Sequence, residues 1–178
     1  MNPDPDVIAS VQSYYNQNVS DIVASAADRG WEVWFRIQWV LFINKNHGGY
    51  QAFNEQKVYS DNPKKSLDVR IDHGGNVALI ELKCLKPTET SKEFSDRLFS
   101  DVNKLANGQQ DVFIGVPPTA RIWALGMAVV PNGQEQAFAN EMGDLLAIGQ
   151  DFRGGKFQAE AGQFGHNHHM FAFYWTKP

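Results

Sequence analysis

The sequence predicts an α/β protein with a mixed central β-sheet flanked by helices. Apolar residues recur with a helical period in three long segments. In several short segments they alternate with polar residues or run together, as in strands. The predicted order is one helix, three strands, one helix, two strands, one helix and two strands. Such an order is typical of a mixed sheet covered by helices.

Three helices are predicted. The first spans about residues 19–44, in one piece or in two joined near Gly30, and its second half is apolar nearly all round, so we expect it to be buried. The second, residues 91–108, is amphipathic, and the third covers residues 134–149. The stripe of the second helix consists of Phe94, Leu98, Val102 and Leu105.

The clearest strand signal is the pair 66–72 and 77–84. Apolar and polar residues alternate along SLDVRID, and the HGGN turn at residues 73–76 predicts that the next strand pairs with it antiparallel. The other predicted strands are 51–59, 111–116, 121–130, 156–161 and 170–176, the last two closing the chain as a pair.

Length and composition favour one domain over residues 1–178, with a loose or peripheral lead at 1–18 and a core from about 20 to 130. The net charge is −4, whereas proteins that coat nucleic acid non-specifically are usually basic, so any such contact must be local. The single cysteine, Cys84, excludes an internal disulfide framework and fits a reducing compartment. We expect no membrane span, because the most apolar segment, 31–43, is short and contains two charged residues.

Two charges stand in a strand that otherwise looks buried. Side chains alternate along a strand, so Glu81 and Lys83 share one face of NVALIELKC. Burying an unpaired charge costs free energy. The hairpin brings Asp68 next to the strand that carries Glu81 and Lys83. Two converging carboxylates and the backbone carbonyl of Leu82 are oxygen ligands that suit Mg²⁺ or Mn²⁺. Lys83 would lie beside that ion, where it could assist a water molecule or neutralise charge on a phosphate.

Asp68, twelve intervening residues and Glu81-Leu82-Lys83, each in an apolar strand, resemble the motif of the PD-(D/E)XK nuclease superfamily. The likeness covers roughly residues 20–130 and departs from the motif at Leu67, where the superfamily often has proline. It implies a restriction-endonuclease-like core with an added C-terminal helix and β-hairpin. It also implies that Asp68 and Glu81 are metal ligands and Lys83 is the catalytic lysine, and that the first core helix supplies another carboxylate, here Glu32.

The function that this resemblance implies is that of a Mg²⁺-dependent (or Mn²⁺-dependent) phosphodiesterase, an endonuclease for which we expect DNA in preference to RNA. Small size and the absence of a recognisable specificity region favour a bacterial toxin or effector domain, for which a neutralising partner is conceivable, acting in the cytoplasm of its own or a target cell. A dimer would let two sites cut both strands. The alternatives are a catalytically inactive nuclease-like module that binds nucleic acid or protein, and a structural α/β domain with incidental ion pairs.

Each motif residue also has a structural interpretation. Glu81 and Lys83 could form an ion pair on a solvated face, Glu32 could pair with Arg36 one helical turn away, and Asp68 could be an ordinary polar-face residue near Arg70.

Weaker signals surround the motif. Asp101 and Lys104 could face the site, although a solvated helix face is the preferred interpretation. The basic residues that could hold phosphates or simply be surface are Lys64, Lys65, Arg70 and Lys86. The histidine cluster, which is a loop or a metal site, contains His166, His168 and His169. Trp123 and Trp175 are core or base-stacking residues, and Cys84 is packed.

Overall fold

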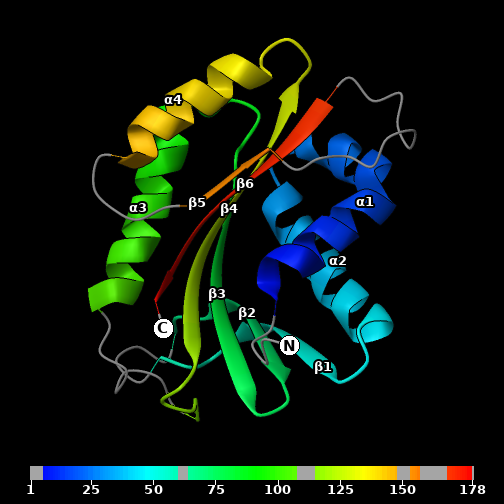
Figure 1. Ribbon diagram of the computed structural model, residues 1–178, viewed down its shortest axis with the longest axis vertical. Coiled ribbons are helices and arrows are strands. Elements are labelled where there is room, and N and C mark those ends of the chain that lie inside the picture. The colour runs from blue at the N-terminus through cyan, green and yellow to red at the C-terminus, as the bar shows by residue number, and fades with distance from the viewer. Residues whose placement is uncertain (1–5, 60–63, 108–114, 148–152, 157–167, 178) are drawn as a thin grey trace.

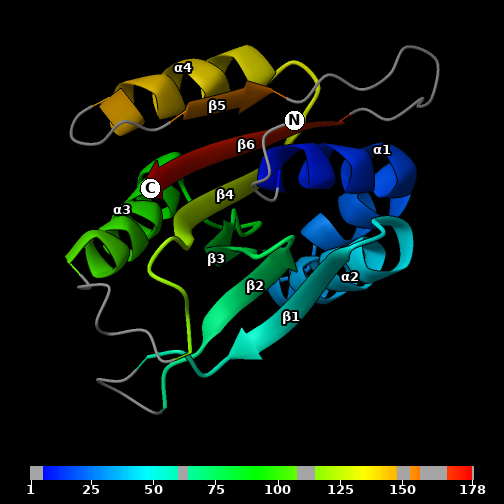
Figure 2. The same cartoon turned by 60° about the horizontal axis from the view of Figure 1, so that its bottom comes forward.

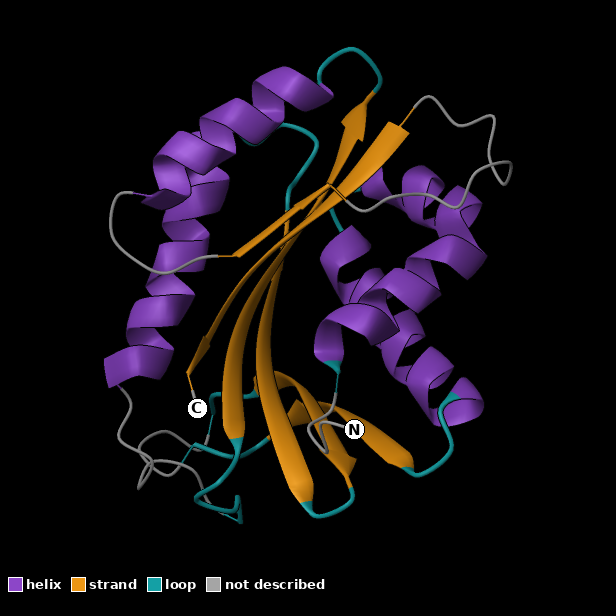
Figure 3. Cartoon of the chain, in the orientation of Figure 1, coloured by secondary structure: helices purple, strands orange, loops and turns teal. Residues whose placement is uncertain are grey.

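The computed structural model describes residues 6–59, 64–107, 115–147, 153–156 and 168–177. It has the mixed sheet flanked by helices that the sequence predicts (Figures 1 and 3). The helices are α1 (Val7–Ala26), α2 (Trp31–Asn46), α3 (Ser91–Asn107) and α4 (Glu135–Ala147). The strands are β1 (Tyr50–Gln56), β2 (Leu67–His73), β3 (Asn76–Cys84), β4 (Arg121–Pro131), β5 (Arg153–Lys156) and β6 (His168–Lys177).

The six strands form one sheet in the order β1-β2-β3-β4-β6-β5. The first three form an antiparallel meander, and β4 lies parallel to β3 because the chain crosses over through α3 between them. The last two neighbours, β6 and β5, are antiparallel again. The sheet is therefore mixed, with its parallel pair at the centre.

Helices cover both faces of this sheet. The pair α1 and α2 lies on one face and the pair α3 and α4 on the other (Figures 1 and 2). Residues of β3 alternate accordingly: Ala78, Ile80 and Leu82 belong to the core under α1 and α2, and Val77 and Leu79 to the core under α3. Glu81 and Lys83 therefore point toward α3, into a covered layer.

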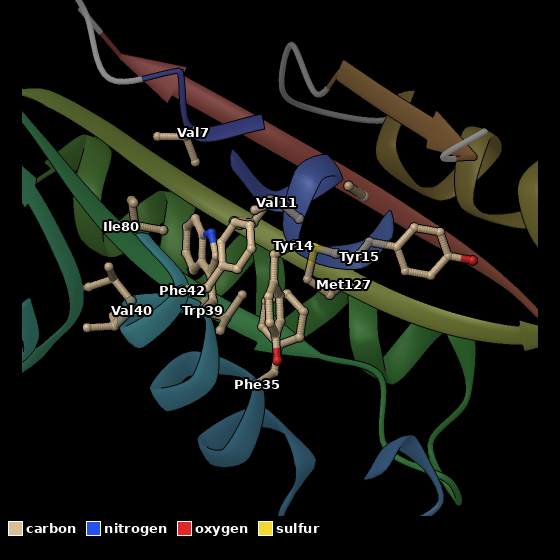
Figure 4. Packing of buried hydrophobic residues seen from close by; sticks show 14 of the residues in the cluster. Val7, Val11, Tyr14, Tyr15, Phe35, Trp39, Val40, Phe42, Ile80 and Met127 are labelled. Carbon is tan, nitrogen blue, oxygen red and sulfur yellow. The ribbon is translucent and has the colours of Figure 1, made fainter. Parts of the chain in front are cut away.

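The prediction that residues 1–18 form a loose or peripheral N-terminal segment is wrong for residues 7–18, which form the first part of α1 and pack into the core. Asp6 caps this helix by accepting a hydrogen bond from the Ala9 amide (2.9 Å). Tyr14 packs its ring against Phe35 of α2 at 5.4 Å between centroids. Figure 4 shows further α1 side chains in the same core. The apolar period already starts at Val7, so burying this face stabilises a helix that begins twelve residues before the predicted start.

The prediction that the apolar helix is wholly buried is wrong for one face of α2. Its inward residues, such as Phe35 and Trp39, are fully buried, but Val33, Ile37 and Leu41 are 50%, 38% and 56% exposed. These three residues are spaced by four, so they form a single stripe on the outer surface of the helix. The break near Gly30, which separates α2 from α1, is confirmed.

The predicted hairpin is confirmed. Strands β2 and β3 pair antiparallel from His73–Asn76 to Val69–Ile80. Gly74 and Gly75 form the turn, and both have positive φ (56° and 84°), a conformation that glycine adopts without a steric penalty.

Contact between α3 and the sheet is close. A Cβ atom built on Gly126 of β4 would lie 2.6 Å from a methyl carbon of Leu98. The absence of a side chain at Gly126 therefore lets α3 approach the centre of the sheet, beside β3.

The later strands were predicted in part. Two predicted strands lie largely outside the described residues, namely 111–114 of the strand 111–116 and 157–161 of the strand 156–161. The strand that pairs with β6 is β5, at Arg153–Lys156. The predicted strand 170–176 is confirmed within β6. Among the described helices, none combines the length and the apolar character that crossing a bilayer would require.

Candidate active site

Asp68 lies where the ladder between β2 and β3 ends. The last paired residues are Val69 and Ile80, yet β3 continues to Cys84. Instead of a backbone partner, the amide of Leu82 donates to Oδ2 of Asp68 (2.8 Å). The Asp68 carboxylate thus takes the place of a ladder acceptor and lies directly against the E-x-K segment.

The other oxygen of Asp68 is bound from the opposite side. Arg36 of α2 donates from Nη1 to Oδ1 of Asp68 (2.6 Å) and from Nη2 to Oε1 of Glu55 (2.6 Å). The Arg36 residue is 8% exposed. Asp68 therefore pairs with Arg36 and not with Arg70, which pairs with Asp72 at 2.7 Å.

Glu81 is 3% exposed and is bound by two donors. The hydroxyl of Tyr59 and the ammonium of Lys104 both donate to Oε1 of Glu81. Burial, and second the negative charge of Asp68, raise the pKa of Glu81 to about 7, against the opposing effect of Lys104. The charge of Glu81 is thus only partly compensated within the protein.

Lys83 completes the group. Its Nζ lies 3.0 Å from Oδ2 of Asp101 on α3 and 3.9 Å from Oδ2 of Asp68, and it donates to the carbonyl of Leu82 (3.0 Å). Burial alone would lower the pKa of Lys83, but the carboxylates of Asp101, Asp68 and Glu32 outweigh burial and raise it. Lys83 is therefore held as an ammonium ion at neutral pH.

The interpretation of Glu81 and Lys83 as a solvated cross-strand ion pair is wrong. Both side chains point into the layer beneath α3 and pair with residues of that helix. Their ion-pair partners are Asp101 and Lys104, which contradicts the preferred interpretation of those two residues as a solvated helix face. Asp101 is itself only 8% exposed.

Glu32 lies beside this group but is bound elsewhere. Its Oε2 accepts from the Cys84 amide (2.8 Å) and from Nη2 of Arg97 (3.0 Å). The predicted alternative, a Glu32–Arg36 pair, is wrong, because Arg36 binds Glu55 and Asp68 instead. The negative charge of Glu32 therefore helps to raise the pKa of Lys83. Its carboxylate accepts a hydrogen bond from the Cys84 amide at the end of β3.

Charged residues of α3 are matched in order by groups of α2 and β3. Going up α3, Arg97 faces Glu32 and the Cys84 carbonyl, Asp101 faces Lys83, and Lys104 faces Glu81. The spacing of four and then three residues places these side chains on one stripe of the helix, next to its apolar stripe. This spacing was visible in the sequence, but the rotation of α3 over the sheet was not.

Tyr59 and Glu55 were not identified from the sequence. Tyr59 is 5% exposed and lies under Lys104, whose Nζ is 4.9 Å from the ring centroid. Glu55 departs from regular strand geometry, with φ of 51°. Nothing in the local pattern of QAFNEQKVY distinguishes these two residues from ordinary strand residues.

The weaker candidates have varied placements. Lys65 lies over the Tyr59 ring (5.8 Å), close to the site, whereas Arg70 is bound to Asp72 and Gly115. Lys86 lines a separate pocket of about 630 Å³ between the starts of α3 and α4.

The other predicted residues are placed as follows. His168 and His169 belong to β6, so the loop interpretation is wrong for them, and His166 lies outside the described residues. Trp123, Trp175 and Cys84 are buried, which confirms their assignment to the core.

The residues fit a hard divalent cation in their donor chemistry. Two carboxylates and the Leu82 carbonyl supply oxygen atoms. Burial, and second the charge of Asp68, raise the pKa of Glu81, and a bound cation would offset both effects. Lys83 would have to leave the Leu82 carbonyl. In the described part of the chain, no three Asp, Glu, His or Cys side chains already converge as a metal cluster.

Comparison with models of known protein families, with curated proteins and with solved structures finds no match to this chain.

Proposed function

We propose that this protein is a metal-dependent phosphodiesterase that cleaves nucleic acid, with DNA as the preferred substrate. The observation that carries the proposal is that Asp68, at the end of the β2–β3 ladder, lies 3.9 Å from Nζ of Lys83 and within electrostatic reach of the buried Glu81. Burying these charges is costly. A chemical function that needs them therefore explains their presence better than a need of the fold does.

The arrangement of elements supports the PD-(D/E)XK resemblance. A helix, an antiparallel meander of three strands, a crossover helix and a strand parallel to the third follow one another from α2 to β4. This is the order expected for the core of that superfamily. The added α4, β5 and β6 follow it in the chain.

The chain's own residues suggest how the reaction is assisted. A divalent ion bound by Asp68, Glu81 and the Leu82 carbonyl would supply a Lewis acid for a phosphoryl oxygen. In the metal-free protein burial lowers the pKa of Lys83, but Asp101 and Asp68 outweigh burial and raise it. As an ammonium ion, Lys83 would donate a hydrogen bond to a phosphoryl oxygen and offset negative charge there.

The test is cleavage of supercoiled plasmid and of structured RNA in Mg²⁺, Mn²⁺ or EDTA. We expect nicking that requires the metal and is lost in Lys83→Ala. The matched control is Lys92→Ala, because Lys92 also pairs with an aspartate of α3, Asp96, but with its side chain 70% exposed. Equal nicking by wild type and Lys83→Ala would overturn the assignment.

One observation favours a second candidate, a nuclease-like module that binds without cleaving. Each acidic motif residue already has a protein cation: Arg36 on Asp68 and Lys104 on Glu81. Such pairing could replace a metal altogether. A folded wild-type protein that retains nucleic acid but cleaves neither polymer would favour this candidate. The broader setting, a toxin or effector domain with a neutralising partner, stays a prediction.

A further inference from the structure

The ladder between β1 and β2 is interrupted opposite Asp68. Its register passes from Asn54–Val69 directly to Gln56–Leu67, so Glu55 and Asp68 are the two residues skipped. Glu55 has φ of 51°, and among the described residues it is the one non-glycine with positive φ. A left-handed backbone is unfavourable for a glutamate, so an interaction elsewhere must hold Glu55 in this conformation.

That interaction is with Arg36. The Glu55 side chain is 61% exposed, yet its Oε1 accepts from Nη2 of the buried Arg36 at 2.6 Å. The remaining Arg36 nitrogen, Nε, is buried and has no hydrogen-bond partner in the described part of the chain. The orientation of the guanidinium therefore depends on two carboxylates, Glu55 and Asp68.

Arg36 in turn fixes how Asp68 is presented. With Oδ1 bound to Arg36 at 2.6 Å, the carboxylate plane is set, and Oδ2 is left facing the Leu82 amide at 2.8 Å and Lys83 at 3.9 Å. Oδ2 is thus the oxygen on the side of the E-x-K segment.

We propose that Glu55 is a positioning residue, whose left-handed backbone aims its carboxylate at Arg36 so that Arg36 holds Asp68 with one oxygen toward Leu82 and Lys83. This deepens the proposed function, because it rests on Asp68 being a ligand in that site. The two skipped residues face each other across one arginine. Local distortion of a strand next to a site commonly redirects a side chain in this way.

The Leu82 amide provides a readout that needs neither metal nor substrate, because its hydrogen bond goes to Asp68 Oδ2. The Cys84 amide is a matched control on the same strand: it also donates to a carboxylate, Glu32, at the same 2.8 Å. Amide hydrogen exchange would be compared in wild type, Glu55→Gln and Glu55→Gly. Both variants remove the charge, but only glycine also removes the backbone strain.

We expect exchange at Leu82 to accelerate roughly tenfold in both variants while exchange at Cys84 stays unchanged. We also expect Glu55→Gly to unfold at a higher urea concentration than Glu55→Gln, because glycine adopts φ of 51° without strain. Unchanged exchange at Leu82, or equal acceleration at Leu82 and Cys84, would overturn the positioning role.

Mn²⁺ affinity, measured on the same proteins, separates this inference from the proposed function. If Glu55 positions a metal ligand, both variants bind Mn²⁺ more weakly than wild type, by roughly tenfold. If wild type binds no Mn²⁺ but Leu82 exchange is still accelerated in the variants, the proposed function is contradicted. The Glu55–Arg36–Asp68 connection is then still supported. Wild type that binds Mn²⁺ with the same affinity as both variants would overturn the inference alone.

Discussion

Lys83 Nζ and Asp101 Oδ2 lie 3.0 Å apart and join the end of β3 to the middle of α3. Their side chains are 21% and 11% exposed, so this pair is screened less by solvent than a surface ion pair. Because Asp101 also helps to raise the pKa of Lys83, the helix maintains the charge of the lysine as well as its position.

Replacing Asp101 with asparagine should therefore destabilise the protein. We expect a loss of about 2 kcal/mol in the free energy of unfolding, between the values for surface pairs and fully buried pairs. Urea denaturation of Asp101→Asn, Lys83→Met and the double variant would measure the coupling. The control is Asp96→Asn, whose partner Lys92 is exposed and whose loss should change stability by less than about 0.5 kcal/mol. Additive effects of the two substitutions at Lys83 and Asp101 would contradict the pairing.

Glu81 should make the metal-free protein less stable as the pH rises. Its pKa of about 7 exceeds the ordinary glutamate value, so between about pH 4.5 and 7 the folded protein holds a proton that the unfolded chain has released. The stabilisation by this proton is complete below that window and is lost as the pH rises through about 7. The shift corresponds to a change on the order of 3 kcal/mol.

Urea denaturation in EDTA across this window, for wild type and Glu81→Gln, would check the prediction. Glutamine cannot titrate, so the variant should lack this part of the pH dependence. Parallel curves for the two proteins would contradict the assignment to Glu81.

Gly126 should tolerate no side chain. A methyl group there would meet Leu98 at 2.6 Å and Phe94 at 3.0 Å, so Gly126→Ala should cost about 2 kcal/mol of stability through overpacking. The matched control is Gly143→Ala on α4, where a Cβ atom meets nothing within 4 Å and helix propensity favours alanine by roughly 0.5–1 kcal/mol. Thermal denaturation should move in opposite directions for the two variants. A stabilising effect of Gly126→Ala would show that α3 does not approach the sheet as closely as described.

Much of the fold could be predicted from the sequence because its signals are local. Alternation in SLDVRID and the Gly-Gly turn are enough to define the β2–β3 hairpin, and the stripe at Phe94 and Leu98 defines α3. The start of α1 is harder to predict, because the proline- and aspartate-rich residues 1–6 are typical of an irregular segment and the apolar period starts directly after them, at Val7.

The motif residues of the site could also be predicted, but their partners could not. The turn fixes the β2–β3 register up to the Val69–Ile80 pair, and Asp68 and Glu81 are the next residues on the two strands. The partners Lys104 and Tyr59 depend on the rotation of α3 and on the path of the chain after β1. Arg36 of α2 contacts both Asp68 and Glu55, and Glu55 departs from regular strand geometry. These contacts are tertiary relationships that no local pattern encodes.

The most direct test of the central claim, that Asp68 and Glu81 together hold a divalent cation beside Lys83, is calorimetric titration of Mn²⁺ into wild type, Asp68→Asn and Glu81→Gln. We predict one ion per chain for wild type and an affinity at least about tenfold weaker in each variant, because each substitution removes one charged ligand. No binding by folded wild type, or equal affinity in all three proteins, would contradict it.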